Sequence, residues 1–271
     1  MEISISMTTL IAAGDSFTWG SDLPDSSSGH ASKLSWSAFA AQQLGYNYKC
    51  LARPGAGNSS IVRRMITGLA KEDISDIIVV VMWTFPVRME VAVNKFSFTQ
   101  NPDLFVDGDE NFITVSPWHS QTVEESLSVM KDIDADRISY FKKQFRGIKE
   151  SGIHDYARSL ISLADSEHYV IETLKSILLL QLYLEANNIR YAFCSTTDQI
   201  SEARTSNNNF VHVIANQIKW EKWATEKGFY DWAKDNNHRI LEMEHPDQSA
   251  HIDYSSKYII PFLKPIMNDG S

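Results

Sequence analysis

Ser16 is the residue whose type and setting first suggest nucleophilic chemistry. It follows the apolar run Thr8–Ala13 and the pair Gly14-Asp15, a pattern expected where a buried strand meets a turn. A serine hydroxyl attacks a carbonyl once a base takes its proton, and its own backbone amide can then stabilise the developing charge. Gly-Asp-Ser alone equally describes an ordinary turn or a helix N-cap, so the interpretation needs a second feature.

The second feature lies near the other end of the sequence, in the run His245-Pro246-Asp247-Gln248-Ser249-Ala250-His251. The apolar spacing that follows predicts a helix over Ser249–Leu263. His245 would stand just before that helix, at the surface, where its ring can reach the end of a neighbouring strand. Taken alone, the same run is an ordinary helix start.

The chain between these features alternates predicted strands and helices. Strands are expected at Thr8–Ala13, Tyr46–Ala52, Asp76–Trp83 and Ile189–Ser195. Helices are expected at Ser35–Leu44, Ser59–Leu69, Tyr156–Asn188 with a break near Asp165-Ser166, Ile214–Trp223 and Tyr230–Lys234. The β-branched run Ile77–Val81 is typical of a strand covered on both faces. This alternation predicts an α/β domain with a mostly parallel sheet.

Three turns follow predicted strands, and each carries polar residues or glycines. They are Gly14-Asp15-Ser16, the segment from Pro54 to Asn58, and Thr84-Phe85-Pro86. The carboxyl ends of parallel strands lie at one edge of the sheet, where working groups of such folds gather. The three turns are therefore expected to converge.

The pattern loosens after Phe85. Asn101-Pro102-Asp103 and Val106-Asp107-Gly108-Asp109 are turn sequences. We predict a single domain over residues 1–271 with an insertion at about residues 86–151 over the catalytic edge, containing a helix around Val123–Gly147.

Composition and motifs exclude several classes of partner and cofactor. The net charge of −9 and the pI near 5.4 argue against a nucleic-acid partner. Gly55-Ala56-Gly57 follows a predicted strand, but Ser60 stands where a dinucleotide loop needs its third glycine. The sequence has no P-loop, no His-Glu-x-x-His and no cysteine pair at ligand spacing. We therefore predict no metal and no cofactor; the oligomeric state stays open.

Membrane and compartment signals are also missing from the sequence. The segment MEISISMTTL has neither a basic region nor a long apolar stretch, so no signal peptide is expected. The apolar runs Ile77–Trp83 and Ile177–Leu184 are far shorter than the ~20 residues of a membrane span. Cys50 and Cys194 fall in predicted buried strands, which favours reduced thiols. These features predict a cytoplasmic protein.

Taken in order, these residues resemble the SGNH hydrolases, the GDSL-like esterases and lipases. That family carries Gly-Asp-Ser after its first strand, matched here by Gly14-Asp15-Ser16, and its serine is the nucleophile. A glycine after the second strand supplies an oxyanion-hole amide; Gly57-Asn58 matches best, with Gly55 as the alternative. The family's His-Pro-x-x-x-Gly/Ala-His run is matched by His245 to His251, which implies that His245 is the base.

Two positions depart from the family pattern. The family has Gly-x-Asn after its third strand, where the asparagine donates to the oxyanion; this chain has Met82-Trp83-Thr84, so the Thr84 hydroxyl is the expected substitute donor. The family also has Asp three residues before the histidine. Here that position is Glu242, with Glu244 as the neighbouring alternative.

The resemblance implies a flavodoxin-like three-layer α/β/α fold with about five strands. It also implies hydrolysis of a small-molecule or glycan ester, for example an O-acetyl group on a carbohydrate, through an acyl-enzyme. The residues expected to line the substrate are Asp15, Asn58, Trp83 and Arg88. The altered third block leaves an alternative open, in which a catalytically weak or inactive chain of this fold acts as a binding or structural component.

Overall fold

The computed structural model describes residues 8–26, 29–72, 74–92, 112–122, 125, 142, 152–241 and 243–266. Its contacts divide the chain into two compact units, one formed by Met1–Pro86 with Val170–Ser271 and the other by Val87–Tyr169. The second unit begins where the insertion is predicted and ends later, at Tyr169. The predicted placement of that insertion over the catalytic edge stays a prediction.

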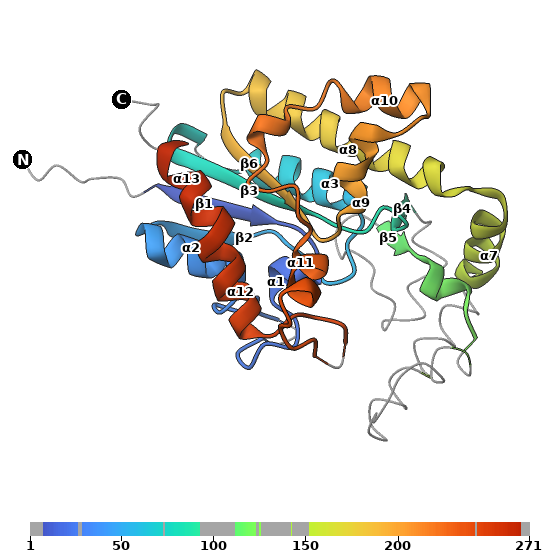
Figure 1. Cartoon of the computed structure of the whole chain (residues 1–271), viewed down its shortest axis with the longest axis horizontal. Coiled ribbons are helices and arrows are strands. Elements are labelled where there is room, and N and C mark those ends of the chain that lie inside the picture. Colours follow the sequence, from blue (N-terminus) through green and yellow to red (C-terminus); the bar gives the residue numbers. More distant parts are fainter. Residues whose placement is uncertain are drawn as a thin grey trace, which may run out of the picture. The chain divides into compact units, whose positions relative to one another are not determined.

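A four-stranded parallel sheet forms the centre of the larger unit, in the order β2-β1-β3-β6 (Figure 1). The strands are β1 (Thr9–Ala13), β2 (Asn47–Cys50), β3 (Ile77–Trp83) and β6 (Arg190–Ser195). Beside β6, a single parallel bridge joins Phe193 to Trp223 at the position where a fifth strand would run. The predicted α/β class with a mostly parallel sheet is confirmed, and the fifth strand is reduced to this bridge.

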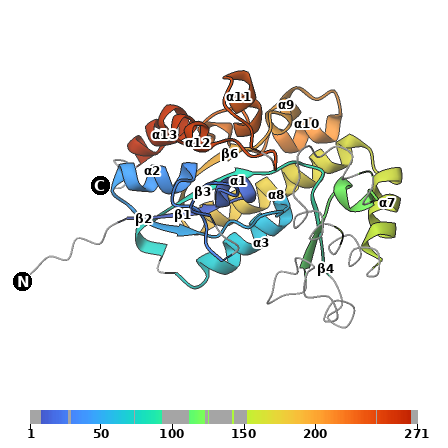
Figure 2. The ribbon, with the colours of Figure 1, turned by 90° about the horizontal axis from the view of Figure 1, so that it is seen from below.

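Helices cover both faces of this sheet, which gives three layers (Figure 2). One face packs against α3 (Asn58–Leu69), α8 (Ser166–Ala186) and α10 (Asn209–Ala215). The other packs against α2 (Trp36–Leu44), α11 (Phe229–Asp235), α12 (Gln248–Tyr254) and α13 (Ile260–Ile266). A cluster of buried hydrophobic side chains lies on each face of the sheet, and successive β3 side chains point alternately into one cluster and the other. All seven are buried, as expected of a central strand covered on both sides.

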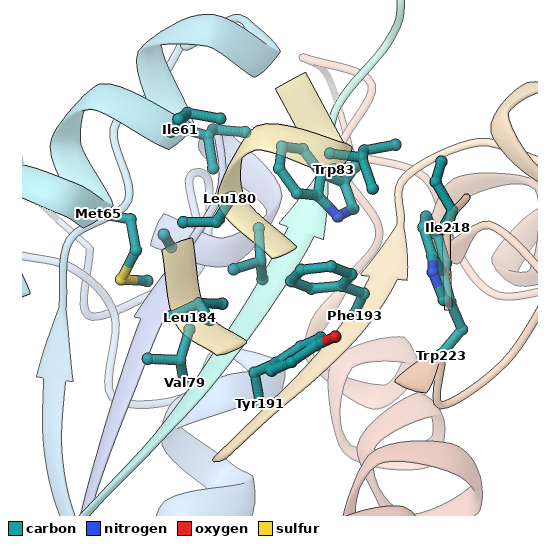
Figure 3. Close-up of a cluster of buried hydrophobic side chains, with 14 of the residues drawn as sticks. Ile61, Met65, Val79, Trp83, Leu180, Leu184, Tyr191, Phe193, Ile218 and Trp223 are labelled. Atoms are coloured by element: carbon teal, nitrogen blue, oxygen red, sulfur yellow. The ribbon is translucent and has the colours of Figure 1, made fainter. Parts of the chain in front are cut away.

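Figure 3 shows the hydrophobic cluster on the α3 and α8 face, in which aromatic and aliphatic side chains from α3, α8, β3 and β6 pack together, with Ile218 and Trp223 beside them. Trp83 at the end of β3 packs edge-on against Phe193 of β6, with ring centroids 5.3 Å apart. Leu180 and Leu184 of α8 cover the same face, and both are fully buried. Trp83 is therefore a core residue of the larger unit.

Local sequence signals explain where several helices begin and end. Ser35 caps α2, and Gly45 ends it with a φ of 71°, a left-handed conformation that glycine adopts without steric cost. The break predicted near Asp165 is confirmed, because α7 (Ile153–Leu163) ends before it and the Asp165 side chain accepts from the His168 amide at 2.9 Å.

The continuous helix predicted over Ile214–Trp223 is wrong. Helix α10 ends at Ala215, and a separate 3-10 turn, η4, covers Trp220–Lys222. The chain leaves helical geometry because Trp223 lies in the parallel bridge to Phe193, and the Ala224 amide donates to the Phe193 carbonyl at 2.8 Å. The remaining short elements of the larger unit are α1 (Ser16–Trp19), η1 (Ile74–Asp76), α9 (Gln199–Glu202), η3 (Ala203–Thr205) and the π-helical η5 (Ser255–Ile259).

The smaller unit has its own hairpin and core. Strands β4 (Met89–Ala92) and β5 (Phe112–Val115) pair antiparallel, and they are followed by η2 (Pro117–Ser120) and α7. Its buried apolar side chains are Ile113, Val115, Ile153 and Ala157. The helix predicted around Val123–Gly147 lies almost wholly outside the described residues. In the part of the chain that is described, no helix has the length and apolar character needed to span a bilayer.

His251 gives the larger unit a specific dependence of stability on pH. Its ring is fully buried in α12, its Nδ1 accepts from the Trp36 amide at 3.1 Å, and burial lowers its pKa from 6.5 to about 3. Below pH 6.5 the unfolded chain takes up a proton that the folded chain refuses, so stability is lost as the pH falls from 6.5 towards 3. The limiting slope is about 1.4 kcal/mol per pH unit for one group.

We expect His251→Asn, which retains an acceptor near the Nδ1 position, to be less stable at pH 7 but to lose this contribution to the slope. Urea unfolding of both proteins between pH 4 and pH 8 measures the difference. His119 also has a lowered pKa, about 4, because its partly buried position disfavours the charged ring, and it contributes equally to both proteins. Parallel stability curves for wild type and variant would contradict the assignment.

Candidate active site

Ser16 lies on a tightly specified turn between β1 and α1. Asp15 caps α1, since its Oδ1 accepts from the Phe17 amide at 3.0 Å. A Cβ at position 14 would lie 2.1 Å from Thr18 Oγ1, so only glycine fits there without rearrangement. Ser16 is buried in this turn, with an exposed fraction of 6% for the whole residue. The local sequence thus presents the serine directly after a buried strand, as predicted.

His245 lies in a short hairpin just before α12, again as predicted. The Leu241 amide donates to the His245 carbonyl at 2.7 Å, and Ile240 pairs with Pro246 in an antiparallel bridge. Asp247 then caps α12 through a 3.0 Å bond from the Ala250 amide. These contacts on both sides fix the position of the histidine backbone.

The imidazole of His245 is bound by a carboxylate that the sequence does not predict, that of Asp22. Its Nδ1 lies 2.8 Å from Asp22 Oδ2, and the two side chains are 12% and 22% exposed. A carboxylate accepts only, so Nδ1 carries the hydrogen, and Nε2 is the nitrogen left to act as a base. Asp22 belongs to the loop after α1 and has a φ of 65°, a conformation that is uncommon outside glycine.

The His245 ring also lies beside the nucleophile turn. Its centroid is 5.1 Å from that of Phe17, the residue that follows Ser16. Among the described residues, no hydrogen bond joins Ser16 Oγ to His245. Bonds between nucleophile and base are often long in structures without substrate and shorten when the reacting complex forms.

Glu242 and Glu244 are the two carboxylates that the sequence predicts as candidates to orient His245. Glu242 lies outside the described residues, so its role stays a prediction. Glu244 does not bind the imidazole; its carboxylate accepts from the Tyr230 hydroxyl of α11. Of the carboxylates that the structure describes near His245, Asp22 is therefore the one in contact with the ring.

The backbone amides of Ser16 and Gly57 both lie at helix starts and belong to buried residues. Ser16 is the first residue of α1, and Gly57 is the N-cap of α3, with φ −93° and ψ 170°. Such amides have no acceptor inside their own helix, and neither meets another acceptor among the described residues. Gly55 lies on an exposed turn with a φ of 78°. Gly57 is thus better placed than Gly55 to donate to an oxyanion.

The Thr84 hydroxyl, predicted to donate to an oxyanion, forms a hydrogen bond within the protein instead. Its hydroxyl donates to Asp15 Oδ2 at 2.6 Å, and its amide donates to Asn58 Oδ1 at 2.8 Å. Asn58 Nδ2 donates in turn to the Thr84 carbonyl at 3.1 Å and to Thr173 Oγ1 at 3.0 Å. A hydroxyl has one hydrogen, so in this structure Thr84 does not offer it to an oxyanion.

Three of the four residues predicted to line the substrate are buried in the structure. Asp15 is fully buried, Asn58 is 2% exposed, and both use their polar atoms in the bonds just described. Trp83 is fully buried against Phe193 (Figure 3). Side chains this enclosed cannot contact a substrate without rearrangement. Arg88 belongs to the smaller unit, and its role stays a prediction.

An aromatic cluster surrounds the Ser16 turn. The Phe17 ring contacts those of Phe85, Phe229 and Tyr230 edge-on, with centroids 6.0–6.2 Å apart. Phe17 itself is 3% exposed. Rings in such a cluster exclude water from the neighbouring polar groups, which strengthens the electrostatic interactions of those groups. Within the described part of the chain, no group of three or more histidine, cysteine or acidic side chains is arranged to hold a metal ion.

Comparison with solved structures finds proteins named as lipolytic or as esterases. A member of the lipolytic protein G-D-S-L family from Veillonella parvula is 12% identical, with a TM-score of 0.42 over 92% of this chain and 95% of that one. A phospholipase A1 from Streptomyces albidoflavus is 10% identical, with a TM-score of 0.41 over 96% and 99% of the two chains. An acetyl xylan esterase from the rumen bacterium Butyrivibrio proteoclasticus is 11% identical, with a TM-score of 0.39 over 96% of this chain and 64% of that one.

No protein-family model and no curated protein sequence matches this chain. The chemistry assigned to the site therefore rests on the chain's own residues.

The crowding at Gly14 yields a stability prediction. We expect Gly14→Ala to lower the free energy of unfolding by about 1–3 kcal/mol, because its Cβ would overlap Thr18 and approach Met82 O at 3.1 Å. Gly29→Ala is the matched control, since a Cβ there meets nothing within 4 Å; its effect should stay within about 0.5 kcal/mol. Denaturant unfolding measures both, and equal effects of the two substitutions would refute the crowding argument.

Proposed function

We propose that this chain is a serine hydrolase that cleaves a carboxylic ester through an acyl-enzyme, with Ser16 as nucleophile and His245 as base. The observation that carries the proposal is the 2.8 Å bond from His245 Nδ1 to Asp22. A carboxylate on Nδ1 leaves Nε2 unprotonated in the neutral ring, and Nε2 is the atom that must receive the serine proton. The 5.1 Å contact between the Phe17 and His245 rings supports the pairing of base and nucleophile.

Acylation follows from these roles. Ser16 Oγ attacks the ester carbonyl carbon while His245 Nε2 takes the hydroxyl proton, and Asp22 stabilises the resulting imidazolium. The carbonyl oxygen becomes an oxyanion, which accepts from the Ser16 and Gly57 amides. The tetrahedral intermediate then expels the alcohol, and His245 gives its proton to the departing oxygen. The acyl group remains on Ser16 as an ester.

Deacylation repeats the sequence with water as the nucleophile. His245 takes a proton from the water as its oxygen attacks the acyl-Ser16 carbonyl, and the same amides hold the second oxyanion. Collapse releases the carboxylic acid, and the proton returns to Ser16 Oγ. No step requires a metal or a cofactor.

The proposed substrate is a small-molecule or glycan ester, for example an O-acetyl group on a carbohydrate. Because Thr84 gives its hydrogen to Asp15, the oxyanion has two donors in this scheme rather than three. Loss of one donor costs roughly 10²–10³-fold in rate in enzymes where it has been measured. We therefore expect slow turnover of simple esters.

The same observation at Thr84 favours one alternative, a chain of this fold that binds an ester or a partner without turning it over. Active-site labelling separates the two, because a fluorophosphonate needs an activated serine hydroxyl but not the natural substrate. The serine-hydrolase proposal predicts covalent labelling of wild type at Ser16, none of Ser16→Ala, and normal labelling of Ser59→Ala, which alters an exposed serine on α3.

Mass spectrometry of the labelled protein identifies the modified residue, and hydrolysis of p-nitrophenyl acetate gives a parallel activity readout. If wild type at high concentration is neither labelled nor active above Ser16→Ala, the chain is not a serine hydrolase, and the binding alternative stands.

The assignment of the acid gives a separate prediction. Asp22→Asn should lower kcat for p-nitrophenyl acetate by about 10²–10⁴-fold with little change in KM, because an amide no longer stabilises the imidazolium and can hold the wrong tautomer. Glu244→Gln is the control, since Glu244 binds Tyr230 rather than the imidazole.

Glu242→Gln completes the comparison of carboxylates. If Asp22 is the acid, Glu242→Gln retains most of the wild-type kcat. If Glu242→Gln loses most of the wild-type kcat while Asp22→Asn keeps a near-normal kcat, the acid is Glu242, at the position that the family pattern implies.

A further inference from the structure

The turns that follow β1, β2 and β3 are bonded to one another through three buried polar side chains. Asp15 follows β1, Asn58 opens α3 after β2, and Thr84 follows β3. Thr84 connects the other two, since its hydroxyl reaches Asp15 at 2.6 Å while its amide and carbonyl bind the Asn58 side chain at 2.8 and 3.1 Å. Asp15 and Thr84 are fully buried, and Asn58 is 2% exposed.

The positions of these partners relative to the oxyanion amides carry the inference. Asp15 directly precedes Ser16, and Asn58 directly follows Gly57. Each side chain that Thr84 binds therefore belongs to the neighbour of one of the two amides proposed to hold the oxyanion. Thr84 therefore links the two amide-bearing turns through its hydrogen bonds to the Asp15 and Asn58 side chains.

We propose that Thr84 is a positioning residue that sets the separation and direction of the Ser16 and Gly57 amides, acting through Asp15 and Asn58. The inference rests on the proposed function, because it assigns those amides to the oxyanion. Oxyanion donors must lie within a few tenths of an ångström of their productive positions, and a misplacement of about 1 Å costs on the order of 10²-fold in rate. A buried, fully bonded network supplies that accuracy.

Thr84→Val tests the link to Asp15, since valine retains the shape of threonine, loses the hydroxyl and keeps the backbone bonds to Asn58. The expected result is a fall of about 10–100-fold in kcat for p-nitrophenyl acetate and in the rate of fluorophosphonate labelling, with KM changed less than threefold. Thr84→Ser retains the hydroxyl and should stay within threefold of wild type. Near-wild-type labelling of Thr84→Val would overturn the proposal.

A double-mutant cycle with Asp15→Ala distinguishes positioning from direct donation. If Thr84 acts through Asp15, adding Thr84→Val to Asp15→Ala causes little further loss. If Thr84 turns its hydroxyl to the oxyanion during the reaction, the two losses multiply, and the proposal is wrong. Thermal unfolding of each variant confirms that the assays are done on folded protein.

Amide hydrogen exchange measured by NMR provides a test that does not depend on catalysis. Thr84→Val should speed exchange at Ser16 by at least threefold and at Gly57 by less, because the bonds to Asn58 are kept, whereas Thr84→Ser should change neither. Unchanged exchange at both amides overturns the positioning role, whatever the activity. If wild type is not labelled but the exchange rates change as expected, the serine-hydrolase proposal fails while the structural link stands.

Discussion

The pairing of β1 with β3 at the centre of the sheet is the constraint on which the site depends. Their register places Ala13 opposite Val81, so the turn that carries Asp15 emerges next to the turn that carries Thr84. Both strands are interior and covered on both faces, so a slip of one residue would send the Trp83 side chain to the opposite layer. The packing of the two layers thus fixes the 2.6 Å bond between Thr84 and Asp15.

The second constraint brings residues from the two ends of the sequence together. Asp22 and His245 are 223 positions apart, yet their side chains meet at 2.8 Å. Asp22 and Glu244 both have left-handed φ values, 65° and 62°, which cost of order 1 kcal/mol each in residues other than glycine. Asp22 is bound to the imidazole and Glu244 to Tyr230, and these bonds help to offset the strain. The two left-handed conformations therefore lie in the loops that carry the proposed acid and the proposed base.

The sequence was informative where function coincides with a regular pattern. Ser16 and Gly57 follow predicted strands, and His245 precedes a capped helix, so periodicity and chain order were enough to select them as candidates. Asp22 had no such signal, because it lies in an irregular loop. It becomes a candidate for the acid only through its contact with His245, near the other end of the sequence. The hydroxyl direction of Thr84 was likewise unpredictable, since it depends on a buried carboxylate from another turn.

The presence of threonine rather than asparagine at the third turn, Thr84, changes the number of hydrogens available there. An asparagine there would have two amide hydrogens and could both bond within the fold and donate to an oxyanion. Threonine has one hydroxyl hydrogen, so it can do one or the other. In this chain the hydrogen goes to Asp15, whose buried carboxylate would otherwise lose one of its bonds, and a buried charge without partners is costly. In the proposed scheme, the hydrogen that Thr84 gives to Asp15 is lost to the oxyanion, and the same bond holds the turn that carries the Ser16 amide.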